Sequence, residues 1–160
     1  MCIRDSDYSG VVTFRKDIRV SYMLQEDALF PWLSVFDNAC LGLKVEKKLT
    51  KENISYVKEL LSKYGLEDFI NKKVNDLSGG MRQRVALIRT IATKPNLVLL
   101  DEPFSALDYQ TRLRVSDDVY NILKEEGITA IMVTHDIGEA ASISSKVIVM
   151  SKRPVSYTHL

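Results

Sequence analysis

The second half of the chain alternates between short apolar runs and amphipathic stretches. Three runs have the composition of strands: "LVLLD" (97–101), "ITAIMVT" (128–134) and "KVIVM" (146–150). Helical spacing separates them, with Gly127 ending one helix and the acid-x-x-Glu pattern of "DIGE" (136–139) opening the next. Strands that alternate with helices predict an α/β fold with a parallel sheet, and the unbroken apolar run 97–101 predicts a strand buried on both faces.

The middle of the chain has a helical pattern instead. Residues 11–25 alternate as one or two strands do, and a helical stripe follows between an N-capping Thr50 and a terminating Gly65. A second stripe predicts a helix that starts near Met81. We therefore expect residues 26–94 to form a helical subdomain inserted into a sheet core. That core would consist of residues 7–25 and 95–154.

Composition excludes several classes of function. With 160 residues, 46% of them apolar and 27% charged, the chain suits one folded domain. A net charge of +1 gives no general attraction to nucleic acid, so we expect no nucleic-acid partner. No apolar run approaches the ~20 residues of a membrane span, which favours the cytosol. Two cysteines and two histidines are too few for a disulfide framework or a metal cluster.

The two ends, "MCIRDS" (1–6) and "VSYTHL" (155–160), continue no neighbouring pattern. One possible coding of residues 1–5, read as its reverse complement, encodes residues 155–159. Coincidence is the alternative, but inverted copies at both ends resemble a translated sequencing adapter. We therefore predict that both ends are non-native tails and set them aside for the fold.

Two acids and a glycine pair are candidates for chemistry. Asp101 and Glu102 end an apolar strand, so they fall at the carboxyl edge of a parallel sheet, where such folds bind ligands. One carboxylate suits Mg²⁺ through water, and the other suits activation of an attacking water. Ser78, Gly79 and Gly80 precede a helix, as phosphate-binding backbone does. A solvent-facing acid pair and a simple turn are the respective alternatives.

Three further side chains point to the same edge. Asp108 closes the short turn "SALD" (105–108), and His135 ends the strand after it. His135 would face the same edge as Glu102, where it could contact a terminal phosphate; a structural histidine is the alternative. Gln25 follows the early strand and is either a ligand of water or Mg²⁺ or a surface glutamine.

The order of these motifs resembles the nucleotide-binding domain of ATP-binding cassette (ABC) proteins over residues 11–154. The resemblance implies ATP and Mg²⁺ as cofactors, Gln25 as the Q-loop glutamine and residues 77–81 as the signature, followed by Gln83. It also implies Asp101 as the Walker B acid and Glu102 as the catalytic base. The D-loop would be residues 105–108, with Asp108 near the nucleotide, and His135 the switch histidine.

No G-x-x-x-x-G-K-S/T loop occurs in the sequence. In ABC proteins this Walker A loop lies further before the Q-loop glutamine than the residues ahead of Gln25 allow. The resemblance therefore implies a partial P-loop NTPase-like sheet that lacks the Walker A strand, loop and helix. Two such domains pack head to tail, and the Ser-Gly-Gly of one completes the phosphate site of the other. We expect the 160 residues alone neither to hydrolyse ATP nor to fold stably.

The segment "EDALFPWLSVFDNACLGL" (26–43) narrows the resemblance to importers. Its apolar residues are either core of the helical subdomain or a groove for a permease helix around Gln25–Phe36. Together with "VTHDIGEA" and "SKRP" it resembles ATPases that power nitrate, sulfonate or taurine uptake. The implied partners are a second ATP-binding subunit, membrane permease subunits and, indirectly, a periplasmic or extracellular solute-binding protein, with the ATPase peripheral on the cytoplasmic face. The alternatives are a soluble non-transport ABC ATPase and an inactive fragment.

Overall fold

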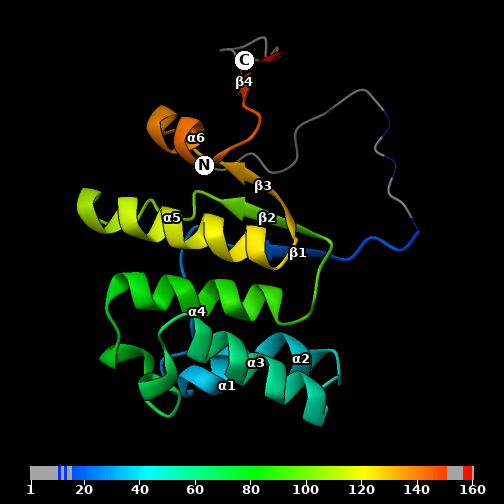
Figure 1. Ribbon diagram of the computed structural model, residues 1–160, viewed down its shortest axis with the longest axis vertical. Helices are drawn as coiled ribbons and strands as arrows, with labels where there is room; N and C mark the ends of the chain where they lie inside the picture. Colours follow the sequence, from blue (N-terminus) through cyan, green and yellow to red (C-terminus); the bar gives the residue numbers. More distant parts are fainter. Residues whose placement is uncertain (1–10, 12, 14–15, 151–156, 160) are drawn as a thin grey trace.

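A computed structural model describes residues 11, 13 and 16–150, and the backbone of residues 157–159. Its strands are β1 (Val20–Met23), β2 (Leu97–Asp101), β3 (Thr129–Val133), β4 (Ile148–Met150) and β5 (Tyr157–His159). Its α-helices are α1 (Val35–Ala39), α2 (Leu41–Val45), α3 (Lys51–Lys63), α4 (Gly79–Ile91), α5 (Tyr109–Glu125) and α6 (Ile137–Ile143), and two short 3₁₀ turns, η1 (Glu67–Phe69) and η2 (Val74–Asp76), join α3 to α4. Figure 1 shows α1 to α3 as a layer on one side of α4, with α5 and the sheet on the other.

A parallel sheet in the order β1-β2-β3 forms the core and confirms the predicted α/β fold. In its register, Tyr22 lies beside Leu99, and Leu99 beside Ile131. Val98 and Leu100 are buried, whereas Leu97 and Leu99 on the opposite face of the same strand are only partly buried. The prediction that residues 97–101 are buried on both faces is therefore wrong. An apolar strand is buried on both faces only if other elements pack on both faces of its sheet. Within the described ranges, the helices bury only one face.

Helix α3 of the helical layer begins and ends where its capping residues predict. The Thr50 hydroxyl accepts a hydrogen bond from the Asn53 amide at 3.3 Å and opens α3. Gly65, with φ of +73°, follows its end in the left-handed region that glycine adopts readily. Residues 26–34 are loop rather than helix, and the first helix begins only after Ser34, which caps it. Cys40 is buried in this layer, and burial raises the pKa of its thiol to about 11.

Helix α4 is the central element of the packing. It begins at Gly79, two residues before the predicted start, because the Ser78 hydroxyl accepts from the Met81 amide and caps the helix there. Val85 and Ile88, both predicted on its apolar stripe, are fully buried. The helix contacts α1, α3, α5 and β1, and Figure 1 shows it between the helical layer and α5. Its N-terminal end therefore has a position fixed by both layers.

The last predicted strand takes a different partner from the expected one. β4 does not join the parallel sheet; it pairs antiparallel with the backbone of β5, which lies in the predicted non-native tail. The backbone N–H and C=O groups of a strand need hydrogen-bond partners. The segment 157–159 is closer in sequence to β4 than β3 is, so a shorter loop brings it alongside. The expectation that residues 146–150 complete the parallel sheet is therefore wrong. No helix of the described residues is both long and apolar enough to cross a membrane.

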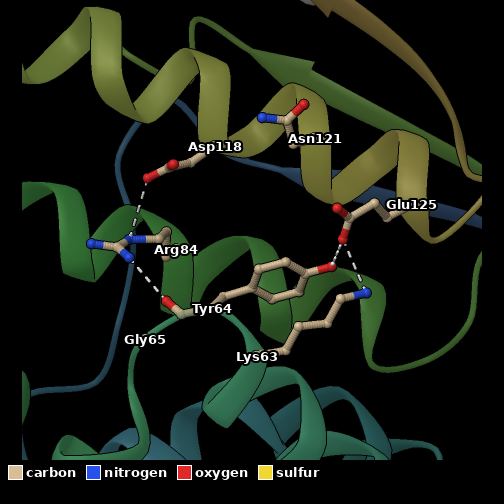
Figure 2. Close-up of a pocket in the computed structure, with 7 residues that line it drawn as sticks. All are labelled: Lys63, Tyr64, Gly65, Arg84, Asp118, Asn121 and Glu125. Carbon is tan, nitrogen blue, oxygen red and sulfur yellow. Dashed lines mark hydrogen bonds and ion pairs between the residues drawn. The ribbon is translucent and has the colours of Figure 1, made fainter.

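A polar joint connects the helical layer to α5. Figure 2 shows Lys63 and Tyr64, at the end of α3, reaching Glu125, with Arg84 between Asp118 and the Tyr64 carbonyl. These side chains border a cavity of about 460 Å³. Several weak contacts hold the two layers together here, since exposed ion pairs each contribute less than about 1 kcal/mol.

Candidate functional site

Three predicted residues meet at the carboxyl end of the sheet. Nε2 of Gln25 donates to Oε2 of Glu102 at 3.1 Å, and Nδ1 of His135 lies 3.1 Å from the other oxygen, Oε1. Gln25 follows β1, Glu102 follows β2 and His135 follows β3, so the parallel register brings them to one edge. The His135 side chain is 73% exposed and Glu102 is 28% exposed. The Glu102 carboxylate is thus oriented from two sides and still faces solvent.

The backbone at Glu102 is strained. Its φ is +44°, in the left-handed region that a non-glycine residue occupies at a cost of about 1–3 kcal/mol. The Glu102 amide donates to the Val133 carbonyl of β3 at 2.8 Å, which holds this conformation. The strain turns the carboxylate out of the line of β2 and toward the loops that follow β1 and β3. Strain of this kind is typical of functional positions.

Asp101, the last residue of β2, accepts a hydrogen bond from the hydroxyl of Tyr22 at 2.5 Å. Tyr22 is not among the residues predicted from the sequence, because its contact with Asp101 depends on the register between β1 and β2. With the Gln25 amide oxygen, Asp101 offers oxygen ligands, the kind Mg²⁺ prefers. No group of three or more potential metal-binding side chains occurs among residues the structure describes. The oxygen atoms of the Asp101 and Gln25 side chains are chemically suited to hold Mg²⁺ through water, and a Mg²⁺ site here stays a prediction.

The predicted signature residues lie at the start of α4, against the turn before α5. A Cβ added to Gly80 would lie 2.8 Å from Val115 Cγ2, and one added to Gly79 would lie 3.1 Å from Leu107 Cδ2. Close packing alone therefore accounts for Gly80. Ser78 is exposed, and its hydroxyl caps α4. Backbone N–H groups at an exposed helix start suit an anion, and their contact with phosphate stays a prediction.

Asp108 is the N-cap of α5. Its carboxylate accepts from the Thr111 amide at 3.1 Å. Hydrogen bonds from the side chain and then from the amide of Thr111 hold the pKa of the exposed Asp108 below its ordinary value. Gln83 differs from the other candidates because it is buried and its amide donates to the Pro103 carbonyl, just after Glu102. Gln83 thus ties α4 to the loop beyond β2. A nucleotide contact for either residue stays a prediction.

The loop after Gln25 is held by arginines of α4. Arg89 donates to the carbonyls of Asp27 and Ala28, each at 2.8 Å, and Arg82 donates to the Asp27 carboxylate at 3.0 Å. Sequence spacing gave no sign of these contacts, because they join residues more than fifty positions apart. The helix that carries the signature therefore also fixes the segment that carries Gln25.

A cavity of about 600 Å³ lies between α5, β3 and the segment before β4, away from the Glu102 edge. Neither this cavity nor the one at the α3–α5 joint is lined by Gln25, Asp101, Glu102 or His135. The Glu102 edge is instead an open surface. Contact of its residues with a phosphate group stays a prediction, and the 160 residues contain no G-x-x-x-x-G-K-S/T loop.

An open parallel sheet with an oriented carboxylate, a histidine and a glutamine at its carboxyl edge has the arrangement with which α/β proteins bind ligands. The ABC transporter family model matches residues 6–105, and the chain belongs to this family.

Known relatives agree with this assignment. The chain is 50% identical over 140 residues to the ABC transporter ATP-binding protein YtlC of Bacillus subtilis, covering 88% of this chain and 54% of YtlC. It is 45% identical over 128 residues to the spermidine/putrescine import ATP-binding protein PotA of Marinobacter nauticus, covering 80% of this chain and 34% of PotA. The chain thus spans about half, or less, of the length of these curated relatives.

A solved structure described as an inward-facing metal-chelate type ABC transporter shares the fold. Its TM-score is 0.75 at 24% identity, over 88% of this chain and 58% of that one. At this identity the likeness establishes the fold alone. The α/β architecture predicted from the alternating strands and helices is therefore found in a solved member of the family.

Proposed function

We propose that the full-length protein binds and hydrolyses ATP as the ATP-binding subunit of an ABC importer. The observation that carries the proposal is the edge at which Gln25 and His135 both lie 3.1 Å from the Glu102 carboxylate. A carboxylate oriented from two sides suits a general base that accepts a proton from water. The proposal concerns the full-length protein because the 160 residues lack a G-x-x-x-x-G-K-S/T loop.

Each residue of the edge has a distinct role in this proposal. Bound ATP and Mg²⁺ would supply the phosphoryl group and the positive charge that balances it. Asp101 and Gln25 would hold Mg²⁺ through water, and Glu102 would accept the proton of the attacking water. His135 keeps the Glu102 carboxylate oriented and donates toward the terminal phosphate.

The residues at the start of α4 act on a second subunit in this proposal. Ser78, Gly79 and Gly80 offer backbone and hydroxyl groups at a helix N-terminus, which favours a nearby anion by roughly 0.3–1 kcal/mol. Asp108 lies on the turn packed against Gly79. Gln83 anchors this helix to Pro103, behind Glu102. A head-to-tail dimer would bring these groups to the phosphates held by its partner.

The segment Gln25–Phe36 is the proposed contact for a permease subunit. Trp32 is 67% exposed and stacks at an angle on Phe30, with ring centroids 4.9 Å apart. Leu29 and Val35 are buried, so only part of this segment belongs to the core. Exposed aromatic side chains beside the catalytic edge suit a docking helix. In this arrangement the protein is peripheral on the cytoplasmic face of the membrane and meets the solute-binding protein only through the permease.

For the transported solute, the motif resemblance favours nitrate, sulfonate or taurine. The relative PotA is instead named for spermidine/putrescine import. The ATP-binding subunit has no contact with the solute in either case, so uptake assays with the cognate permease must decide. Uptake of a polyamine but of none of the three favoured solutes would overturn this part of the proposal.

The test of the proposed function uses the full-length protein with radiolabelled ATP and a range of Mg²⁺ concentrations. We expect Mg²⁺-dependent hydrolysis, and we expect Asp101→Asn to raise the Mg²⁺ concentration needed for half-maximal rate. Asp117→Asn is the matched control, because Asp117 is an exposed carboxylate on α5. A folded full-length protein that binds no ATP, or that hydrolyses it without Mg²⁺, would overturn the proposal.

A further inference from the structure

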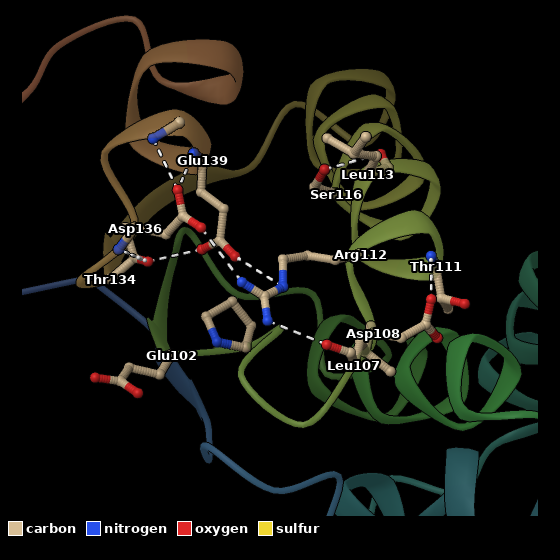
Figure 3. A network of polar contacts seen from close by, with 12 residues as sticks. Glu102, Leu107, Asp108, Thr111, Arg112, Leu113, Ser116, Thr134, Asp136 and Glu139 are labelled. Atoms are coloured by element: carbon tan, nitrogen blue, oxygen red, sulfur yellow. Dashed lines mark hydrogen bonds and ion pairs between the residues drawn. The ribbon is translucent and has the colours of Figure 1, made fainter.

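One arginine joins the two loops that carry Asp108 and His135. Arg112, in the first turn of α5, donates from Nη2 to the Leu107 carbonyl at 3.1 Å and from Nη1 to the Asp136 carboxylate at 3.3 Å. Its Nε lies 3.6 Å from Oε1 of Glu139. Figure 3 shows the guanidinium reaching from α5 into the space between these three acceptors. The arginine thus connects the turn before α5 to the start of α6.

The acceptors of Arg112 are themselves fixed on both sides of His135. Asp136 caps α6 by accepting from the amides of Gly138 and Glu139, at 2.8 and 3.2 Å. The hydroxyl of Thr134 donates to Oε2 of Glu139 at 2.7 Å and accepts from the Asp136 amide at 3.0 Å. The residues before and after His135 are therefore held in place, whereas its own ring is free to face Glu102.

The composition of this network suits arginine in particular. Glu139 is 9% exposed and Asp136 lies beside it, so two carboxylates need a cation between them. A guanidinium presents its donors in a planar fork and reaches three acceptors at once, which a lysine ammonium on a flexible stem does not. The buried Nε of Arg112 has no hydrogen bond within the described residues, so a small shift of Glu139 toward it would strengthen the joint.

We propose that Arg112 is the positioning residue for His135: it fixes the Thr134–Asp136 loop to the Leu107–Asp108 turn, so that the two loops move together. The proposal rests on the proposed function, because it assigns Arg112 a part in ATP hydrolysis without contact with the nucleotide. A change at the turn that faces a second subunit would then alter the presentation of His135 to Glu102.

The test compares Arg112→Ala and Arg112→Lys with Arg114→Ala in the full-length protein. Arg114 is an exposed arginine of the same helix, so the control removes the same charge. We expect Arg112→Ala to lower kcat about 10- to 100-fold, as displacement of a catalytic group by about 1 Å does, with KM for ATP changed less than about twofold. Arg112→Lys should recover part of kcat, and it replaces the alanine variant if the latter does not fold.

A second background separates positioning from stability. With His135→Ala already present, Arg112→Ala should lower kcat by less than about twofold, because the residue that it positions is gone. Equal factors in both backgrounds would overturn the proposal. So would an Arg112→Ala variant with the kcat of the Arg114→Ala control.

Hydrogen exchange tests the Arg112 contacts independently of ATP hydrolysis. Amides 134–140 should exchange faster in Arg112→Ala than in Arg114→Ala, and the same rate in both would overturn the proposal. If the folded wild type does not hydrolyse ATP, the proposed function fails, and exchange at residues 134–140 alone decides whether Arg112 holds this loop.

Discussion

The sheet edge and the start of α4 both carry predicted site residues, but they use them differently. At the edge, Gln25, Glu102 and His135 direct their side chains at one another. At the start of α4, Ser78 caps its own helix, and Gly80 allows close contact with Val115. The arrangement of the sheet edge therefore depends on side-chain contacts, and that of the start of α4 depends on backbone geometry. Substitutions at the sheet edge should accordingly affect the rate of reaction, and substitutions at the start of α4 should also affect the stability of the fold.

The largest expected effect is at Glu102. In the full-length protein, Glu102→Gln should lower kcat for ATP hydrolysis about 10²- to 10⁴-fold, because it removes a general base while keeping the shape and the neutral hydrogen bonds. Steady-state hydrolysis measures this, and Glu59→Gln, an exposed position on α3, is the control. Unfolding by denaturant should change little. Activity within threefold of wild type would contradict the assignment of the edge as catalytic.

At Gly80 we expect the reverse, a change in stability. The Cβ of Gly80→Ala would lie 2.8 Å from Val115 Cγ2, and separating α4 from α5 to relieve this should lower the free energy of unfolding by about 1–3 kcal/mol. Denaturant unfolding measures the loss. Gly79→Ala is the matched control, because its 3.1 Å neighbour is the flexible end of Leu107. Replacing Val115 with alanine should make the Gly80 change less costly; equal costs in both backgrounds would show that the glycine is not needed for packing.

Removing the helix cap should have a smaller effect. Ser78→Ala leaves the Met81 amide without its acceptor and should lower the free energy of unfolding by about 0.5–2 kcal/mol. Ser78→Asp should keep the cap, which makes it a control for stability. If Ser78 acts only as a cap, hydrolysis by the aspartate variant will match wild type. A rate loss with unchanged stability in Ser78→Asp would sharpen the comparison, since it would show that this hydroxyl also meets an anion.

The smallest expected effect is a pH dependence at Asp108. Hydrogen bonds from the side chain and the amide of Thr111 lower the pKa of Asp108 below the ordinary value of 3.8. The stabilisation is therefore present above that value and is lost as the pH falls through the lowered pKa. Asp108→Asn keeps a cap without a titrating group. Unfolding midpoints should therefore fall more steeply with acid in wild type than in this variant. Parallel curves would mean that Asp108 does not contribute to acid sensitivity.

Sequence patterns predicted the meeting of Gln25, Glu102 and His135 because each follows a strand of one parallel sheet. The cap at Thr50 was equally local and equally predictable. The role of Arg112 was not, because a single arginine in a helix gives no sign of which loop it faces. The pairing of β4 was also beyond the sequence, since an apolar run does not specify its partner strand. Local rules thus predicted which residues meet at the sheet edge, and only the tertiary arrangement showed how the other contacts form.

The two faces of the sheet illustrate the same limit. Val98 and Leu100 point to the helices, while Ile131 and Val133 on the opposite face are exposed. The sequences of these strands are apolar on both sides, so composition alone could not tell which face the described residues cover.

Trp32 is the only tryptophan of the chain and lies in the proposed permease surface, mostly exposed and next to Phe30. An indole in water emits at longer wavelength than one enclosed by protein. The protein therefore carries its own fluorescent reporter at this surface, and no dye needs to be attached. Mixing it with permease in detergent should shift the emission to shorter wavelength if docking covers Trp32. The spectrum should stay unchanged if the subunits meet elsewhere.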